Sequence, residues 1–340
     1  MNKKLGNILK VALFFGFGAL VVWLSVRNIT PEQWGNMREA AKEAKYGWLA
    51  LSVVFGVLSH LSRSMRWQLM LETLGHRPRL GNTFMAVMSG LIVNLAIPRF
   101  GEVVRVGLIN RYEKIPIDKV VGTLVTDRAI DVITLLSLTL IATLLQFDIV
   151  GDYVLNQLWP LISEKISGLV SGNLLLFAVI GIVLIIGFVV LLKYLGKIGE
   201  KFKGIISSVW EGVLSVRKLK RPGQFVLHSV LIWGLYMAMT YICFFAFDYT
   251  EDLGFLTGLA VLCFATFGFL TTPGGVGTYP LVVASILLLY GVSYELGTLF
   301  GWIIWAVQTF LVIVFGGISF LYLPIFNKNY EPPQDHTAEN

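Results

Sequence analysis

The sequence has few charged residues and contains no polar stretch long enough to fold as a soluble domain. Only 14% of its 340 residues are charged and 56% are hydrophobic, whereas a soluble globular domain carries about 25% charged residues. The segments between the apolar runs do not exceed roughly 30 residues, which is too short for an attached catalytic domain. These absences exclude an ordinary soluble protein. We therefore expect one transmembrane domain over residues 1–326 and a short cytoplasmic tail over 327–340, which we expect to be disordered.

Cysteine and histidine are also scarce. The two cysteines, Cys243 and Cys263, both lie in apolar runs and are expected to be buried small hydrophobic residues, which excludes a disulfide framework. The four histidines show no metal-ligand spacing, and the sequence has no HExxH, CxxC or P-loop motif. We also find no Ser-His-Asp set. We therefore expect no metal, no cofactor and no enzymatic activity.

Long hydrophobic runs are abundant instead. A helix needs about 20 apolar residues to cross the hydrocarbon core of a membrane. Six runs meet this length, at residues 9–26, 47–66, 120–146, 173–192, 224–246 and 297–323. Two further apolar regions are interrupted, 81–111 by IPRFGEVVR and 253–291 by TTPGGVGTYP. The expected fold is an all-α polytopic membrane protein with six full spans and two re-entrant helical hairpins.

The distribution of Lys and Arg predicts the orientation in the membrane. Segments 63–80 and 193–223 contain four and eight basic residues and are expected in the cytoplasm, whereas 147–172 contains one and is expected outside. Both termini are then cytoplasmic. This bias also explains the net charge of +6, so nucleic-acid binding is not implied.

The same orientation constrains the first interrupted region. The chain must cross the membrane an odd number of times between the cytoplasmic segment 63–80 and the outer segment 147–172. The run at 120–146 supplies one crossing, so 81–119 must cross either zero times or twice. Two crossings would put Arg99, Glu102 and Arg105 into lipid, at roughly 2.5–3.5 kcal/mol for each charge. We therefore expect this region to enter from the cytoplasm, turn near Pro98–Gly101 and return.

The second interrupted region completes a repeated pattern. If it also enters and returns, residues 1–146 and 173–323 each contain two spans, a hairpin and a third span, beginning on opposite sides of the membrane. Such an inverted repeat is common in transporters.

The motif TPGGVG predicts a break between two half-helices. Pro273 ends a helix, and Gly274, Gly275 and Gly277 permit positive φ angles and a close approach of the backbone. A break at membrane depth must be buried in protein or line a wet cavity, because lipid cannot satisfy its amides and carbonyls. We favour a break that lines a substrate site, and a kinked helix or surface turn is the alternative.

The motif NLAIPRFGEVVR adds charge to a second break. Arg99 and Arg105 are permanent donors suited to phosphate or carboxylate, and Glu102 and Arg105 are i,i+3 neighbours if the segment is helical. We favour an anion site beside a cavity. The alternative is an interfacial loop whose arginines extend to lipid headgroups.

Two further motifs place charges in or beside spans. Asp127 and Asp131 share one helix face, and Arg128 is placed to pair with Asp131 at i,i+3. Two interpretations of this motif, TDRAID at residues 126–131, stay open. It forms either a structural ion cluster or a site that binds a proton or a headgroup. Arg63 and Arg66 of SRSMRW also share a face, and the alternative there is an ordinary cytoplasmic arginine pair beside an interfacial tryptophan.

Taken in order, the four motifs resemble those of the lysylphosphatidylglycerol synthase transmembrane-region family, also called flippase-like domain proteins. The matching residues are Arg63-x-x-Arg66-Trp67, Asn94-x-x-x-Pro98-Arg99-x-Gly101-Glu102-x-x-Arg105, Asp127-Arg128-x-x-Asp131 and Thr272-Pro273-Gly274-Gly275-x-Gly277. The resemblance covers about residues 10–323. One departure is that the family often has an acidic residue shortly after the Gly-rich motif, where this chain has Tyr279 and Pro280.

The resemblance implies a multi-pass protein of the bacterial inner membrane, similar to the flippase half of the multiple peptide resistance factor. In that relative the membrane domain is thought to move aminoacylated phosphatidylglycerol between leaflets. A separate soluble domain attaches the amino acid, and we expect this chain to lack that domain and its synthase activity. Other members are linked to export of hopanoids or glycolipids, so the resemblance does not identify the cargo.

The functional hypothesis is translocation of a phospholipid or other polar-headgroup lipid between leaflets, through a cavity lined by both hairpins. The candidate substrate-binding residues are Arg63, Arg66, Asn94, Arg99, Glu102, Arg105, Asp127, Arg128, Asp131, Thr272, Gly274, Gly275, Gly277 and Tyr279. The expected partner is a membrane lipid with an anionic or phosphate-bearing headgroup, and a homodimer is left open. The alternatives are a membrane enzyme that acts on a lipid phosphate or polyprenyl-linked sugar, and a scaffold for a lipid-modifying partner.

Overall fold

The structure is a computed structural model that describes residues 23, 27, 29–97, 99–149 and 219–332. Apart from Trp23, the spans expected at 9–26 and 173–192 lie outside the described residues. Within the described ranges the chain is helical and contains no strand.

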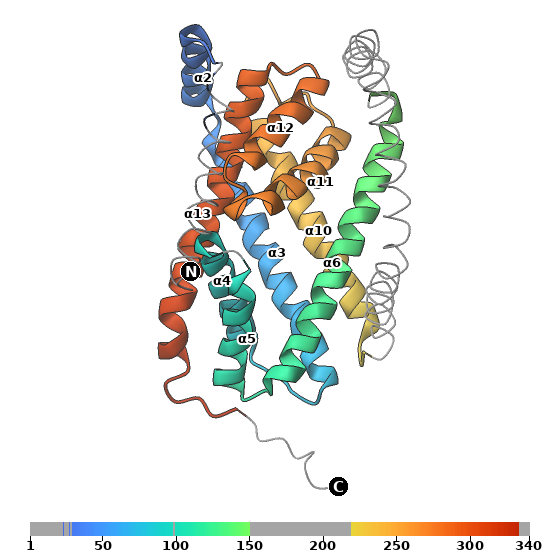
Figure 1. Cartoon of the computed structure of the whole chain (residues 1–340), viewed down its shortest axis with the longest axis vertical. Coiled ribbons are helices and arrows are strands. Elements are labelled where there is room, and N and C mark those ends of the chain that lie inside the picture. The colour runs from blue at the N-terminus through green and yellow to red at the C-terminus, as the bar shows by residue number, and fades with distance from the viewer. Residues whose placement is uncertain (1–22, 24–26, 28, 98, 150–218, 333–340) are drawn as a thin grey trace, which may run out of the picture.

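Four long apolar helices form the frame of the molecule (Figure 1). They are α3 (Tyr46–Thr73), α6 (Ile117–Leu145), α10 (Pro222–Ile242, extended by η3, Cys243–Ala246) and α13 (Tyr294–Phe326), and each is long and apolar enough to cross a membrane. At a rise of 1.5 Å per residue, helices of this length span about 30–50 Å, against a hydrocarbon core of about 30 Å. Four of the six predicted spans are therefore confirmed as apolar helices, and the protein is a multi-pass membrane protein. A short helix, α2 (Pro31–Glu43), precedes α3 and begins with a capping box between Thr30 and Gln33.

Both interrupted regions fold as pairs of short helices. The first contains α4 (Leu80–Ala96) and α5 (Phe100–Glu113), and the second contains α11 (Phe255–Thr271), the single turn η4 (Pro273–Gly275) and α12 (Thr278–Leu289). None of these helices exceeds 17 residues, which is shorter than the about 20 that a full crossing requires. The two helices of each pair pack against each other. We call the pairs the first hairpin (α4 and α5) and the second hairpin (α11 and α12).

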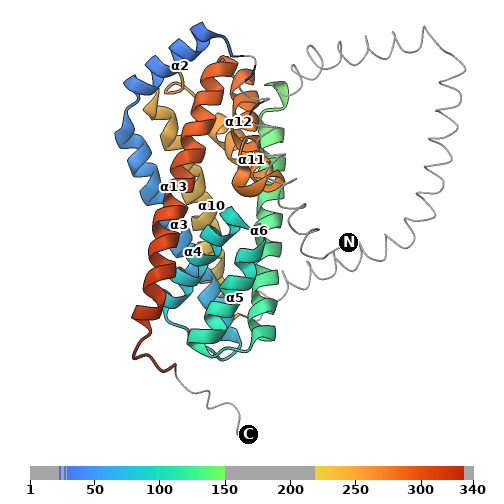
Figure 2. The same cartoon turned by 60° about the vertical axis from the view of Figure 1, so that its left-hand side comes forward.

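The two hairpins lie one above the other between the long helices (Figures 1 and 2). The helix order is the same around each one: α3, first hairpin, α6, and then α10, second hairpin, α13. In Figure 1, α3 runs downward and α10 runs upward, and the hairpins point toward each other from opposite ends. The two sets of elements are joined mainly through contacts between α3 and α10, and between α13 and α4.

The hairpins meet at their turns. A Cβ atom added to Gly274 in the second turn would lie 2.9 Å from Cδ2 of Leu95, near the end of α4. The indole nitrogen of Trp305 on α13 donates a hydrogen bond of 2.7 Å to the carbonyl oxygen of Gly274, so one backbone group that the break exposes has a protein partner. Thr272 is buried. The break between α11 and α12 therefore packs against protein on more than one side.

The first hairpin closes very tightly. A Cβ atom added to Gly101 on α5 would lie 1.9 Å from the carbonyl oxygen of Gly90 on α4. The amide of Gly101 donates a hydrogen bond of 2.7 Å to Oδ1 of Asn94, which satisfies a free amide at the start of α5. Asn94 thus ties the end of one helix to the beginning of the next.

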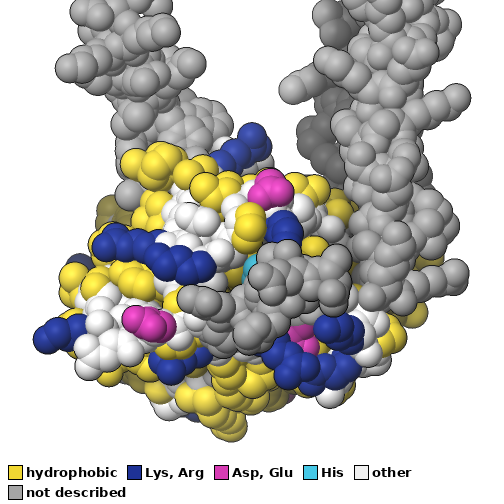
Figure 3. All heavy atoms as spheres, turned by 90° about the horizontal axis from the view of Figure 1, so that it is seen from below, with side chains coloured by type: hydrophobic (Ala, Val, Ile, Leu, Met, Phe, Trp, Pro, Cys, Tyr) yellow, Lys and Arg dark blue, Asp and Glu magenta, His cyan; other side chains and the backbone are white. Residues whose placement is uncertain are grey.

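A polar cluster fixes the open end of the first hairpin to the end of α13. Buried Glu113, the last residue of α5, accepts hydrogen bonds from the backbone amide of Arg79 and from the side chains of Asn82 and Tyr330. Asn82 and Asn327 also exchange amide hydrogen bonds of 2.9 and 2.7 Å. Seen from below, this end of the molecule carries several Lys and Arg side chains among apolar ones (Figure 3).

Candidate functional site

The core of the candidate site is an ion cluster between α3 and α6. Nη2 of Arg66 lies 2.6 Å from Oδ1 of Asp127 and 2.6 Å from Oδ1 of Asp131. Arg63 pairs with the other oxygen of Asp131. Neither Arg66 nor Asp127 is exposed to solvent at all. This confirms that Arg63 and Arg66 share one face of α3. It also confirms that Asp127 and Asp131 share one face of α6, and the two faces oppose each other.

The cluster lies deep in the helix bundle. Arg63 is ten residues before the end of α3, and Asp127 is ten residues after the start of α6, so both lie about 15 Å from the lower end of their helices. Charges at such depth are costly unless they are paired. The surrounding polar side chains support these pairs: Trp67 donates to Thr123 at 3.0 Å, and Arg66 reaches Ser229 of α10 at 3.4 Å.

The first hairpin contributes two further charged residues. Nη1 of Arg105 on α5 lies 3.5 Å from Oδ2 of Asp127, and its guanidinium carbon lies 3.7 Å from the ring centroid of Trp67. Glu102, one turn earlier, pairs with Arg128 of α6. Two ion pairs therefore connect α5 to α6, and α5 supplies the positive charge in one pair and the negative charge in the other.

These pairs correct one interpretation of the sequence. Arg128 was expected to be placed for pairing with Asp131 in the same helix, but each of the two has its partner on another helix. Glu102 and Arg105 are i,i+3 neighbours on α5, as predicted, and their partners also lie on another helix. The i,i+3 spacing shows which side chains share a face, whereas the packing of neighbouring helices decides which opposite charge is nearest. Buried charges gain more from a partner in the interior than from one beside them on a solvated helix surface.

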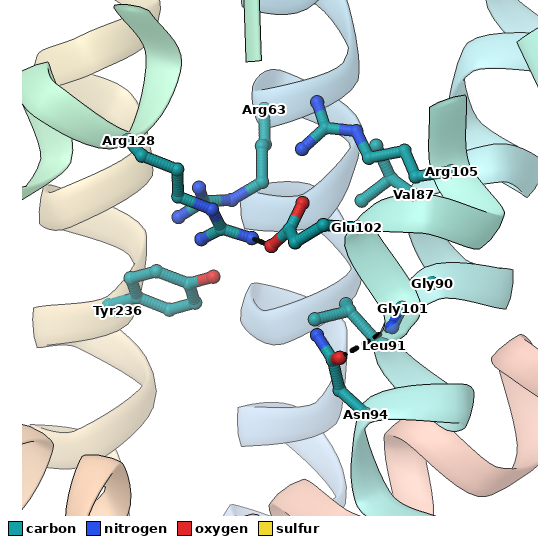
Figure 4. Close-up of a pocket in the computed structure, with 10 residues that line it drawn as sticks. All are labelled: Arg63, Val87, Gly90, Leu91, Asn94, Gly101, Glu102, Arg105, Arg128 and Tyr236. Carbon is teal, nitrogen blue, oxygen red and sulfur yellow. Dashed lines mark hydrogen bonds and ion pairs between the residues drawn. The ribbon is translucent and has the colours of Figure 1, made fainter. Parts of the chain in front are cut away.

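A cavity of about 100 Å³ opens beside this cluster (Figure 4). Its polar lining comes from five helices, the two of the first hairpin and α3, α6 and α10: Arg63, Asn94, Glu102, Arg105, Arg128 and Tyr236. The remaining wall consists of Val87, Gly90, Leu91 and Gly101. Figure 4 shows arginine side chains from α3, α5 and α6 converging on one region, with the hydroxyl of Tyr236 on α10 directed toward it.

Tyr236 is the site residue that sequence reasoning missed. It lies in an apolar run with no charge or Gly-Pro break beside it, so no local pattern marks it. Its ring centroid lies 5.9 Å from the guanidinium carbon of Arg63, because α10 packs along α3. A tyrosine in a predicted span is a usable signal only when the helix that it faces is known.

The residues of the second hairpin are placed differently from those of the first. Gly274, Gly275 and Gly277 adopt φ angles of 56°, 74° and 77°, as expected for a turn that needs glycine. The hydroxyl groups of Thr272 and Thr278 are 2.6 Å apart. Tyr279 is buried and accepts a hydrogen bond of 3.1 Å from Gln308. None of these residues lines the cavity described above, although the turn touches the first hairpin at Leu95.

Arg99 does not join the cluster. It is exposed and occupies the left-handed region with φ of 64° at the turn between α4 and α5. Within the described part of the chain it forms no ion pair. Of the two arginines expected to form the anion site, the structure therefore brings only Arg105 into the cavity wall.

The described residues contain no group of three His, Cys, Asp or Glu side chains that could hold a metal ion. Cys243 and Cys263 are buried free cysteines, as the sequence predicts. The groups at the site are therefore guanidinium groups, carboxylates, a phenol and an amide. This set can bind and orient an anion by charge and hydrogen bonds.

Comparison with known proteins identifies the family indicated by the motifs. The family described as the lysylphosphatidylglycerol synthase TM region matches residues 7–316. UPF0104 membrane protein MJ1595 of Methanocaldococcus jannaschii is 24% identical over 291 residues, which cover 75% of this chain and 83% of that relative. No solved structure matches. Since the family match extends over most of the chain, the protein belongs to the lysylphosphatidylglycerol synthase transmembrane-region family.

Proposed function

We propose that the protein moves a polar-headgroup lipid between the two leaflets of the membrane. The observation that carries this proposal is the arginine-lined cavity, which lies beside an ion cluster about 15 Å from the lower ends of α3 and α6 and is lined in part by residues of long apolar helices. Lipid headgroups do not enter such depth unaided, because hydrocarbon offers no partner for a charge. A cavity with fixed guanidinium groups supplies those partners.

The arrangement of helices supports an inverted repeat with two re-entrant hairpins. The short length of α4, α5, α11 and α12, their packing in pairs and the contact between the two turns are all consistent with hairpins that enter from opposite faces. Transporters of this design bind their substrates near the midplane, where the repeats meet. In this proposal each hairpin closes the route to one side of the membrane.

A lipid would reach the site from the side, between α5 and α6. The Arg128 side chain is 45% exposed at this position, and large apolar side chains beside it are exposed as well, among them Val103, Val125 and Val132. A headgroup could pass Arg128 into the cavity while its acyl chains stay against this apolar surface. The described residues reveal no nucleotide-binding motif, and transport in this proposal is passive or driven by an ion gradient.

The scaffold alternative is favoured by one observation, the compact pairing of Asp127 and Asp131 with arginines. A scaffold, however, needs no cavity beside those pairs. The enzyme alternative requires a carboxylate that can exchange protons with a substrate, and Asp127 is fully buried and held by Arg66 and Arg105. We therefore place translocation first.

The test is a leaflet-exchange assay. Full-length protein is reconstituted into liposomes that contain a trace of fluorescent lipid, and a membrane-impermeant quencher reports how fast inner-leaflet lipid becomes accessible. We expect faster exchange than in empty liposomes for at least one lipid of a panel that varies the headgroup. Arg105→Gln should abolish the acceleration, whereas Arg111→Gln, which changes an exposed arginine on the same helix, should preserve it. Absence of acceleration across the whole panel would refute the proposal.

A further inference from the structure

Among the described residues, the ion cluster around the cavity contains one more positive charge than negative charge. Its arginines are Arg63, Arg66, Arg105 and Arg128, and its carboxylates are Glu102, Asp127 and Asp131. Each carboxylate pairs with at least one of these arginines. Arginine does not lose its proton in proteins, and a buried charge without a counterion is costly. The cluster is therefore short of one negative charge.

The shortage is concentrated at Arg105. Within the described part of the chain its one ion pair, to Asp127, measures 3.5 Å and is the longest in the cluster. Its Nε and Nη2 atoms are buried without a hydrogen-bond partner, and the residue is only 3% exposed. Its guanidinium carbon lies 3.7 Å from the ring centroid of Trp67, which fixes the plane of the group. Arg105 thus presents unused donors in a fixed orientation.

The cavity beside Arg105 brings together donors from several walls (Figure 4). Arg63 of α3 and Arg128 of α6 line it together with Arg105 of α5. Asn94 lines it as well, and because its side-chain oxygen already accepts a hydrogen bond from the backbone, its NH2 group is left to donate. Oε2 of Glu102 is also buried without a partner, and a water molecule beside the ligand would donate to it. Positive groups that converge from three helices share one ligand only if it is small and accepts hydrogen bonds from all sides.

We propose that the cavity binds a free monovalent inorganic anion of halide size, with Arg105 as its principal ligand. One such ion supplies the missing charge, and because it is spherical it accepts hydrogen bonds from every wall. The cavity of about 100 Å³ has room for a halide ion together with water, since a water molecule takes roughly 30 Å³. It is well below the roughly 300–1,000 Å³ of pockets that enclose a drug-sized ligand.

This inference goes beyond the proposed function, because the ion is a resident counterion of the protein and not the lipid that it moves. Its effect is on the first hairpin. Without an anion, Arg105 of α5 shares the cavity with the guanidinium groups of Arg63 and Arg128, and like charges repel each other more strongly inside a protein than in water. An anion between them replaces this repulsion with attraction. It therefore stabilises α5 against α3 and α6.

Two other occupants of the cavity would give different results. Water molecules would satisfy the donors of Arg105 but would add no charge, so the stability of the protein would not depend on which anion the buffer contains. A phosphodiester group also carries one negative charge, but it is bulkier than a halide because it carries two substituents. Salts of both kinds of anion therefore separate the possibilities.

The test measures the thermal unfolding midpoint of the purified full-length protein in non-ionic detergent, after bound lipid has been washed away. Sodium chloride, sodium bromide and sodium dimethyl phosphate are each titrated against sodium gluconate at constant ionic strength. We expect chloride and bromide to raise the midpoint with a saturable dose dependence. Equal midpoints in all the salts would overturn the inference, and so would a rise that does not saturate. Stronger protection by dimethyl phosphate than by chloride would assign the cavity to a phosphate group and overturn the inference as well.

Variants assign the effect to the cavity. Arg105→Gln should raise the chloride concentration for half-maximal protection at least tenfold, and in gluconate its midpoint should be no lower than that of the wild type, because it removes an uncompensated charge. Arg105→Lys keeps the charge but loses the fork of donors, so it should raise that concentration less. Arg111→Gln changes an exposed arginine on the same helix and should leave the response unchanged. If Arg105→Gln keeps the full response to chloride, or is less stable than the wild type in gluconate, the inference fails.

Hydrogen exchange supplies a readout in the wild type itself. The backbone amides of α5 should exchange more slowly in chloride than in gluconate, whereas those of α12 should exchange at the same rate in both salts. Equal exchange of α5 in the two salts would overturn the location of the site. Both measurements detect binding in detergent, so they succeed or fail independently of whether the protein moves lipid between leaflets.

Discussion

The contact between Gly101 and Gly90 allows a sharp test of how the first hairpin is built. In Gly101→Ala the added methyl group would lie 1.9 Å from the carbonyl oxygen of Gly90 and 2.6 Å from Cγ of Asn94. Backbone atoms at the first contact cannot rotate away, so α4 and α5 must separate by about 1 Å. Overpacking of this kind costs about 1–3 kcal/mol, and stretching the Asn94–Gly101 hydrogen bond removes roughly 0.5–1.5 kcal/mol more. We expect a loss of about 2–4 kcal/mol in the free energy of unfolding.

A second glycine on the same helix supplies the control. Gly107 is exposed, and an added Cβ would meet nothing within 4 Å, so Gly107→Ala should stabilise the helix by roughly 0.5–1 kcal/mol. The two variants are therefore predicted to shift the unfolding midpoint in opposite directions, measured by circular dichroism in detergent during heating. If Gly101→Ala is as stable as Gly107→Ala, the two helices do not approach each other as described, and the part of the cavity wall that they form is not built as described.

Three further predictions follow from other parts of the structure. Asp127→Asn should lower the free energy of unfolding by about 3–5 kcal/mol, because it leaves buried arginines without their counterion, whereas Asp118→Asn in the exposed first turn of α6 should cost about 0.3–1 kcal/mol; denaturation in a series of detergent mixtures compares the two. Tyr330 lies beyond the spans, and its burial, together with the hydrogen bond that it donates to a carboxylate, raises the pKa of its phenol to about 12. Because this pKa is raised above its unfolded value of 10.0, the stabilising contribution of Tyr330 is complete below pH 10 and is lost as the pH rises toward 12. A spectrophotometric titration should show one phenol fewer in the high-pH phase of Tyr330→Phe than in that of the wild type. A phenol that instead disappears from the ordinary phase near pH 10 would contradict the contact. Cysteines introduced in place of Lys114 and Asp252 should react with a membrane-impermeant maleimide from opposite sides of sealed vesicles, and labelling of both from one side would contradict the orientation of the hairpins.

Much of the fold follows from the length and interruption of the apolar runs. The runs at 47–66, 120–146, 224–246 and 297–323 became the long helices because uninterrupted apolar sequences of that length have few other stable forms in a membrane. The two interruptions became turns for local reasons: at one, Gly274 and its neighbours accept positive φ angles, and at the other, Arg99 itself takes the left-handed conformation.

The candidate site was predictable only in part. Helical periodicity shows that Asp127 and Asp131 share a face, but it does not show which helix they meet. The partners of Glu102 and Arg128 depend on how α5 lies against α6, which is a property of packing over distances that sequence spacing does not encode. Tyr236 was missed for the same reason, and Arg99 was assigned to the site because its charge is visible in the sequence whereas its direction is not.

The two hairpins differ sharply in chemistry, although they are alike in shape. The first carries the charges of the cavity wall, whereas α11, η4 and α12 contain no Asp, Glu, Lys, Arg or His. A passive carrier with such unequal ends still brings both leaflets to the same final composition, because no energy enters the cycle. The initial transport rate, however, depends differently on the lipid content of the two leaflets. On the side of the charged first hairpin the rate would saturate at a low content of the transported lipid. On the side of the uncharged second hairpin it would saturate only at a much higher content. Initial rates measured in each direction would therefore have different half-saturation values in a single protein.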